Sequence, residues 1–373
     1  MYSEIKLPVK YPPLTTFTGY AAALAILLTH KASYDWVFSH YLQTYVIDVV
    51  NRNENINNEN YDRQLRVPFT ACFLGDFDNR RLANSVDDYF FLRREGCPYF
   101  DIFEIPNDML DIYESSFSTF VKKMIDMSMY VFLYVDVSKI NEYNITIPAS
   151  HEILIYGYND EKKEIYYGDF PNNPVNKYKF STCSYEEIDT AYKNVVNLFV
   201  PPVKSVSIIR YNDFQGKYEY KYVQDTIREY IYPDRKKADG FREYTITNFT
   251  WVNWKTRVHI GVDVYTYLSE FCDVELAAGI KNIDYRLYHA MYDHKEMMLL
   301  RFDYLLQRGW IGEEKTPLIS RYACVRDNML SIRNMIIKFN RKPDQGMITQ
   351  LQELLLETKE LEITLLKQIF DVE

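Results

Sequence analysis

The feature that most constrains the fold is a pair of apolar runs, residues 151–158 and 164–170, joined by a short polar segment. The connecting residues have the sequence NDEKK, which is typical of a turn between two strands. His151 opens the first run, and Asp169 lies at the end of the second. Because adjacent antiparallel strands bring their open ends side by side, we expect these two side chains to be neighbours.

A His–Asp pair of this kind can support acid–base chemistry. A carboxylate bonded to one ring nitrogen fixes the imidazole tautomer and stabilises the imidazolium, which leaves the other nitrogen free to take or give a proton. The plainer alternative is that His151 ends a strand and Asp169 caps a turn before Pro171. The two residues alone do not decide between these interpretations.

Helices are expected on the amino-terminal side of the hairpin. Residues 21–30 are small and aliphatic on every side, which predicts a buried helix. The hydroxyl side chains placed to cap it are Thr15, Thr16 and Thr18. An amphipathic helix is expected from residue 34 to about residue 51. A third helix is expected to end near residue 127, with Asn107 or Asp108 as its cap.

The remaining amino-terminal sequence is rich in strand signals. Residues 129–135 form a continuous apolar run, as a buried strand does. Ser184 is placed to begin a short helix that ends near residue 194. The other segments expected to be strands are 66–74, 178–183 and 203–211.

The carboxyl-terminal half has a different pattern. Residues 218–232 are predicted to be helical, a less regular segment follows to about residue 257, and nearly everything from residue 262 onward is helical. An apolar stripe near the end favours packing within a bundle over a coiled coil with a partner. Its members are Met347, Leu351, Leu354, Leu361 and Leu365. Glu357, Glu360 and Glu362 are expected to lie on a solvated helix face.

Length and composition narrow the class of protein. A chain of 373 residues exceeds the usual single domain, so we predict an α/β domain over 1–212 and a helical domain over 213–373. The net charge of −9 argues against a nucleic-acid partner or an anionic membrane surface. No early apolar run has the length of a signal peptide or a bilayer span, so we expect a cytoplasmic protein.

The sequence offers little to a cofactor or a metal. The five cysteines are scattered without a CxxC pair, which suggests neither a disulfide framework nor a zinc site. No glycine-rich phosphate-binding motif and no HExxH motif are present. His289 and His294 are five residues apart, which is not one helical face. We therefore expect no cofactor and no bound metal.

The sequences HEILIYGYND at 151–160 and YYGDF at 166–170 resemble the His-bearing hairpin of the butirosin biosynthesis protein H-like family. That family belongs to the papain-like, C39-peptidase-like group. Further segments with the same resemblance span most of the chain. They are Trp36, Tyr41 and Gln43; Cys97 to Tyr99; Gly261 to Tyr265; His294, Lys295, Met297, Met298 and Arg301; and 332–338.

This resemblance implies an α+β papain-like fold followed by an all-helical carboxyl-terminal domain. Proteins of the group often act as acyltransferases in natural-product assembly. A thiol takes an acyl group from an acyl or peptidyl carrier protein, and an amine acceptor then resolves the thioester to an amide. On that pattern His151 is the general base and acid, and Asp169 orients it.

The nucleophile of this pattern is missing. A cysteine is expected at the amino end of the first buried helix, where the helix dipole lowers the pKa of a thiol. The chain has the sequence GYAAALA from residue 19, which puts Gly19 at the cysteine position. A shift of register would put Thr18, Ala21 or Ala22 there instead. No cysteine precedes Cys72.

Three explanations for the missing thiol stay open: natural loss, deliberate replacement, or the use of another residue such as Thr18. Cys72 lies in an apolar run and is expected to be core, and loop packing is the favoured role of Cys97. Three functions therefore compete. The chain is an amide-forming acyltransferase, a noncatalytic binding or scaffold protein of such a pathway, or a cysteine-type peptidase in which water replaces the amine.

Overall fold

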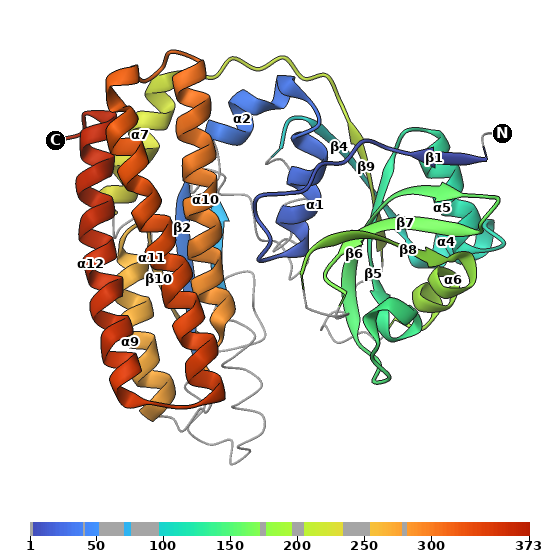
Figure 1. Cartoon of the computed structure of the whole chain (residues 1–373). Helices are drawn as coiled ribbons and strands as arrows, with labels where there is room; N and C mark the ends of the chain where they lie inside the picture. The colour runs from blue at the N-terminus through green and yellow to red at the C-terminus, as the bar shows by residue number, and fades with distance from the viewer. Residues whose placement is uncertain are drawn as a thin grey trace. The chain divides into compact units, whose positions relative to one another are not determined.

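The computed structural model gives the conformation of most of the chain. The residues that it describes are 3–39, 42–51, 71–75, 97–171, 177–195, 205–233, 254–277 and 282–373. They form a mixed α/β chain with an antiparallel sheet and a helical carboxyl-terminal region, as the sequence predicted (Figure 1).

The chain divides into two compact units. The amino-terminal unit consists of Met1–Tyr34 and Arg81–Gln215, and the carboxyl-terminal unit of Asp35–Arg80 and Gly216–Glu373. The predicted boundary after residue 212 is close to the observed one after Gln215, but the predicted first domain also included residues 35–80. That segment belongs with the second unit because its strand β2 (Gln43–Asn51) pairs there with β10 (Trp254–Ile260).

The amino-terminal unit contains an antiparallel sheet. Within the described residues its strand order is β4-β9-β5-β6-β7-β8, with β1 added beside β6. Aromatic and β-branched residues dominate these strands, and such side chains fit a pleated, half-buried surface. The strands are β1 (Glu4–Lys6), β4 (Phe100–Pro106), β5 (Tyr130–Asp136), β6 (Ser150–Asn159), β7 (Glu164–Asp169), β8 (Lys179–Ser184) and β9 (Ser205–Tyr211).

The hairpin of β6 and β7 is present as predicted. Its register pairs Asn159 with Glu164 at the turn and Leu154 with Gly168 farther along, with a shift between Ile155 and Gly157. Gly157 has no room for a side chain, because a Cβ atom there would lie 2.4 Å from the carbonyl oxygen of Ile5 in β1. A glycine is therefore required at this point, where the backbone of β1 passes close to β6.

Helices pack against this sheet. All ten residues of α1 (Thr18–Leu27) are buried, in agreement with the small and aliphatic composition that predicted it. The single helix expected to end near residue 127 is two helices, α4 (Asn107–Tyr113) and α5 (Phe117–Asp126). Ser116 separates them, because its side chain accepts a hydrogen bond from the backbone of Thr119 and so caps α5.

The helix predicted after Ser184 is α6 (Tyr185–Lys193). Ser184 and Glu187 form a reciprocal capping box at its amino end, which fixes the exit of the chain from β8.

At the start of the carboxyl-terminal unit, one predicted helix is replaced in part by a strand. The helix predicted from residue 34 to about residue 51 ends early, as α2 (Tyr34–Ser39), and residues 43–51 form the strand β2. The β-branched run around Val46 to Val50 favours the extended conformation. Strand β2 lies between β10 and β3 (Ala71–Gly75). Strand β10 falls partly in the segment that was predicted only as less regular.

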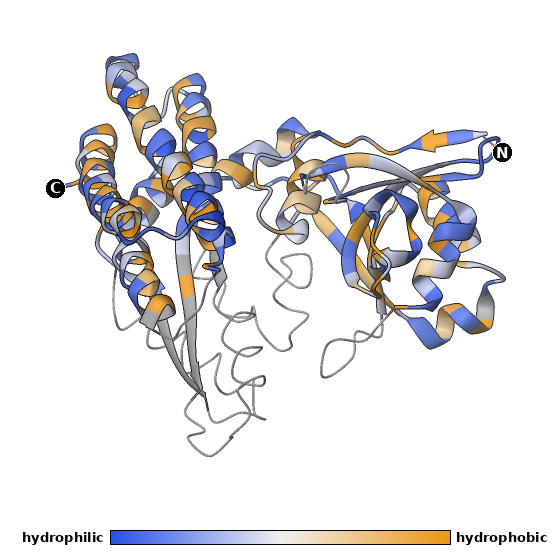
Figure 2. Cartoon of the chain, turned by 60° about the horizontal axis from the view of Figure 1, so that its bottom comes forward, coloured by the Kyte–Doolittle hydropathy of each residue, from blue (hydrophilic) through white to orange (hydrophobic). Residues whose placement is uncertain are grey.

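Helices make up most of the rest of this unit, as the sequence predicted (Figure 1). Hydrophilic and hydrophobic residues are interspersed along these helices (Figure 2), as in helices that bury one side against a core. None of the described helices combines the length and apolar character needed to cross a bilayer. The helices are α7 (Tyr220–Ile231), α9 (Asp263–Ala277), α10 (Tyr285–Gln307), α11 (Thr316–Arg341) and α12 (Gln345–Phe370).

Candidate functional site

The structure brings His151 and Asp169 together. His151 is the second residue of β6 and Asp169 the last of β7, and Nδ1 of the imidazole lies 2.9 Å from Oδ2 of the carboxylate. A carboxylate only accepts hydrogen bonds, so Nδ1 carries the proton and Nε2 is the other reactive nitrogen. The contact predicted from the hairpin is therefore confirmed.

The Asp169 carboxylate is fully buried and binds more than the histidine. Tyr143 donates its hydroxyl to Oδ2, the same oxygen that His151 contacts. Thr18 donates its hydroxyl to Oδ1 over 3.3 Å. Burying a carboxylate is costly unless hydrogen bonds replace its water, and these donors supply that replacement.

The amino end of α1 lies at the same carboxylate. Thr18 is the first residue of this helix, and Gly19, next in sequence, is also buried. Ala21 and Ala22 are fully buried farther along the helix. Among the four positions considered for a nucleophile, the structure thus shows a polar contact to the site for Thr18, and Gly19 adjoins it without a side chain.

The cysteines in the described part of the amino-terminal unit do not supply the missing thiol. They are Cys97 and Cys183, and burial raises the pKa of both, to about 12 for Cys97. Cys272 is buried in the carboxyl-terminal unit, and Cys324 is exposed on α11 of that unit. Cys72 lies in β3, and its side chain is outside the described structure. A raised pKa keeps a thiol protonated and a poor nucleophile.

Electrostatics favour the protonated form of His151. Burial alone lowers the pKa of the imidazole, but the charge of Asp169 and its hydrogen bond outweigh burial and raise the pKa to about 9. The side chain is still 42% exposed. At neutral pH the pair is therefore an imidazolium held on a buried carboxylate, with one face open to solvent.

A second carboxyl group adjoins the pair. Glu152 follows His151 in β6, is buried, and accepts a hydrogen bond of 2.5 Å from the hydroxyl of Tyr134 in β5. Burial raises the pKa of Glu152 to about 7. Its charge therefore changes near neutral pH, next to the imidazolium.

Tyr143 is the site residue that sequence reasoning missed. It lies in a short 3₁₀ turn, Asn141–Tyr143, in the connection between β5 and β6. Burial and the nearby charge of Asp169 raise the pKa of Tyr143 well above its ordinary value, so the phenol acts as a neutral donor. No periodic pattern distinguishes it among the 34 tyrosines of the chain.

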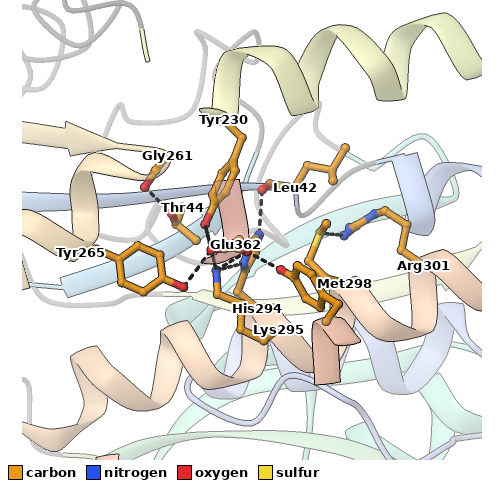
Figure 3. Close-up of polar contacts among 11 residues, drawn as sticks. Leu42, Thr44, Tyr230, Gly261, Tyr265, His294, Lys295, Met298, Arg301 and Glu362 are labelled. Atoms are coloured by element: carbon orange, nitrogen blue, oxygen red, sulfur yellow. Dashed lines mark hydrogen bonds and ion pairs between the residues drawn. The ribbon is translucent and has the colours of Figure 1, made fainter. Parts of the chain in front are cut away.

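The carboxyl-terminal unit contains a separate polar cluster (Figure 3). Lys295 of α10 and Glu362 of α12 form an ion pair at 2.8 Å, and both side chains are fully buried. Tyr230 and Tyr265 donate hydroxyls to the carboxylate at 3.0 and 2.7 Å, and Tyr322 donates to it as well. The prediction that Glu362 lies on a solvated face is wrong, although Glu357 and Glu360 are exposed.

His294 completes this cluster. Lys295 donates to its Nδ1 at 2.9 Å, so its Nε2 carries the proton and donates to the carbonyl of Leu42 at 2.8 Å. Burial and the charge of Lys295 lower the pKa of His294 well below its ordinary value, which keeps it neutral. Both ring nitrogens are therefore used inside the protein.

Groups of acidic, histidine and cysteine residues with the geometry of a metal site are absent from the described ranges. No protein-family model matches the chain, and no curated protein matches it significantly.

Proposed function

We propose that the amino-terminal unit is a papain-like acyl-transfer module of natural-product assembly that retains its histidine and orienting carboxylate but has no cysteine at the amino end of α1. In this chain it binds the acyl group of a carrier-protein thioester together with an amine acceptor, and it does not form an acyl-enzyme. The observation that carries this proposal is the His151–Asp169 contact of 2.9 Å on a carboxylate that also binds the first residue of α1.

The protonation state supports a site built for a thiolate. A thiol enzyme of this type keeps an imidazolium beside a thiolate, and a His151 pKa of about 9 gives that imidazolium at neutral pH. A general base must be unprotonated, and with this pKa roughly one molecule in a hundred is so at pH 7. The pair is therefore suited to a negative partner, which Gly19 does not provide.

Restoring the thiol tests the proposal. We expect Thr18→Cys or Gly19→Cys to become acylated when the protein is incubated with an acyl-carrier thioester, seen as added mass on the intact chain. Ala21→Cys and Ala22→Cys cover the other registers. Ala23→Cys is the matched control in the same buried helix and is expected to stay unlabelled.

Two further comparisons are needed to interpret the acylation of the cysteine variants. Acylation must disappear when His151→Ala is added to the reactive variant, and the unaltered chain must bind the carrier protein without gaining mass. The proposal is overturned if all four folded cysteine variants stay unlabelled. Acylation of the unaltered chain would favour the active acyltransferase, and hydrolysis of a peptide by it would favour the peptidase.

The His151–Asp169 coupling can be measured directly by NMR titration of the imidazole. We expect Asp169→Asn to lower the His151 pKa well below about 9, because the charge and hydrogen bond of Asp169 are lost and burial is then opposed only by Glu152. Asp160→Asn is the matched control, since Asp160 lies in the turn of the same hairpin and contacts Lys122. A His151 pKa near 9 in Asp169→Asn would remove the orienting role of Asp169.

A further inference from the structure

The orientation of the Asp169 carboxylate depends on more than its contact with His151. The last torsion of an aspartate side chain is broad, so a carboxylate held at one oxygen can rotate. Here Tyr143 bonds Oδ2 and Thr18 bonds Oδ1, and the two donors together define the plane of the group. His151 then meets Oδ2 in a fixed direction.

The connection that carries Tyr143 is tied down at both ends. Asp136, the last residue of β5, is buried and accepts hydrogen bonds of 3.1 Å from the backbone of Ser138 and from that of Ala149. The two ends of the connection, residues 137–149, are thus both bonded to the carboxylate of Asp136. Asn144 follows Tyr143 in the left-handed conformation, at φ 52°, and turns the chain there.

The middle of the connection is anchored as well. Glu142 accepts a hydrogen bond of 2.8 Å from Tyr167 of β7 and another from Ser181 of β8. The backbone of Asn141 donates to Glu187 of α6 at 2.9 Å. Tyr143 is therefore presented by a segment that two strands and a helix hold in place.

From this arrangement we infer that Tyr143 and Thr18 are positioning residues, which hold the Asp169 carboxylate in the one orientation that keeps the Nδ1 proton of His151 bonded. The connection 137–149 is the element that delivers Tyr143. This inference deepens the function proposed above, because it concerns how the same site keeps its histidine oriented. Neither residue is assigned a chemical step.

The ring and the hydroxyl of Tyr143 can be separated experimentally. The ring stacks on that of Tyr167, with centroids 6.3 Å apart and planes 14° from parallel, and this packing does not need the hydroxyl. Tyr143→Phe therefore removes the bond to Asp169 and keeps the stack. Tyr158→Phe is the matched control, since it removes a buried phenol hydroxyl that bonds Asp126 and leaves both Asp169 and the anchors of the connection 137–149 untouched.

The readout is the exchange of the His151 Nδ1 proton with water, followed by NMR on the full chain without substrate. We expect Tyr143→Phe to speed this exchange by about tenfold, the size of effect that follows from losing one hydrogen bond to a charged group. Tyr158→Phe should leave the rate within about twofold of the unaltered chain. Equal rates in Tyr143→Phe and the unaltered chain would overturn the role of Tyr143.

Thr18 gives an independent arm, which also serves if Tyr143→Phe fails to fold. Thr18→Val keeps the shape of the side chain without its hydroxyl and should speed the exchange. Thr18→Ser keeps the hydroxyl and should restore the slow rate. Equal rates in the valine and serine variants would contradict the role of Thr18.

The result does not depend on acyl transfer. If the cysteine-restored variants stay unlabelled while Tyr143→Phe speeds the exchange, the function proposed above is wrong and the positioning role stands. Acylation of Gly19→Cys together with an unchanged exchange rate in Tyr143→Phe would support the proposed function and overturn the positioning role.

Discussion

Each of the two units places a cation on a carboxylate that at least one tyrosine hydroxyl also contacts. The two clusters differ in whether a polar atom of the cluster stays open to solvent. Glu362 and Lys295 are both fully buried, and His294 beside them uses both ring nitrogens. Asp169 is equally buried, but its partner His151 is 42% exposed. Within the described residues, Nε2 of His151 makes no hydrogen bond. This nitrogen is therefore able to form a hydrogen bond with a ligand.

This difference separates a structural role from a chemical one. A polar group that is buried and fully satisfied stabilises or specifies a fold, and it offers nothing to a substrate. A group that is fixed on one side and open on the other is arranged as a reactive residue is. Under the function proposed above, the amino-terminal cluster carries the chemistry, and the carboxyl-terminal cluster holds its helices together.

We call the buried group of Glu362, Lys295 and His294 the closed cluster, and the group of Asp169 and His151 the open cluster. The largest effect is expected from disrupting the closed cluster. Glu362→Gln leaves the Lys295 ammonium buried without a counter-charge, and we expect the free energy of unfolding to fall by about 3–5 kcal/mol. Chemical denaturation measures this loss. Glu360→Gln is the matched control, since Glu360 is exposed on the same helix and its replacement should stay within about 0.5 kcal/mol.

A double variant sharpens the same prediction. Adding Lys295→Met to Glu362→Gln removes the orphaned charge, so most of the lost stability should return. If Glu362→Gln alone costs less than about 1 kcal/mol, or the double variant is worse than the single one, the cluster does not hold the helices together by its charges.

A smaller effect is expected from Glu152, beside the open cluster. Burial raises its pKa from an ordinary 4.5 to about 7, so the folded chain holds this proton more tightly than the unfolded chain does. Stability from this group is therefore highest below pH 4.5 and is lost as pH rises through about 7. We expect Glu152→Gln to be more stable than the unaltered chain by about 2 kcal/mol at pH 8, with the gain gone by pH 4.

Denaturation curves over this pH range check the prediction. Glu161→Gln, at an exposed position in the turn of the same hairpin, should leave the pH dependence unchanged. A Glu152→Gln gain that is the same at pH 4 and pH 8 would show that packing, and not ionisation, is responsible.

Local patterns made part of the fold and site predictable. The hairpin could be found because two apolar runs flank a polar turn, and the same geometry placed His151 near Asp169. Ser184 was a readable cap because a glutamate follows three residues later. In each case neighbouring residues in the sequence carry the whole signal.

The missed features depend on contacts between distant segments. Tyr143 reaches Asp169 from a connection with no periodic pattern. Glu362 shares its helix with exposed glutamates, and its burial is explained by partners that are distant in sequence: Lys295, 67 residues away, and three tyrosine hydroxyls. The apolar residues of 43–51 fit the period of a helix as well as that of a strand. Pairing with β10, which is distant in sequence, makes this segment a strand.

The smallest expected effect concerns His151 itself. Its folded pKa of about 9 lies above the ordinary 6.5, so its contribution to stability is complete below pH 6.5 and is lost as pH rises through about 9. Because the side chain is 42% exposed, solvent screens the interaction and we expect about 1 kcal/mol. His151→Gln should therefore be less stable than the unaltered chain at pH 6 by that amount, and equally stable above pH 9.

The control is another histidine of the same unit, whose pKa is shifted in the opposite direction. His30 stacks on Tyr211 at 3.5 Å, and burial lowers its pKa. Its protonation therefore costs stability as pH falls, so His30→Gln should gain stability on acidification where His151→Gln loses it. If both variants shift in the same direction between pH 9 and pH 6, the imidazolium of His151 is not held by Asp169. The open cluster would then lose the charge that distinguishes it from the neutral His294 of the closed one.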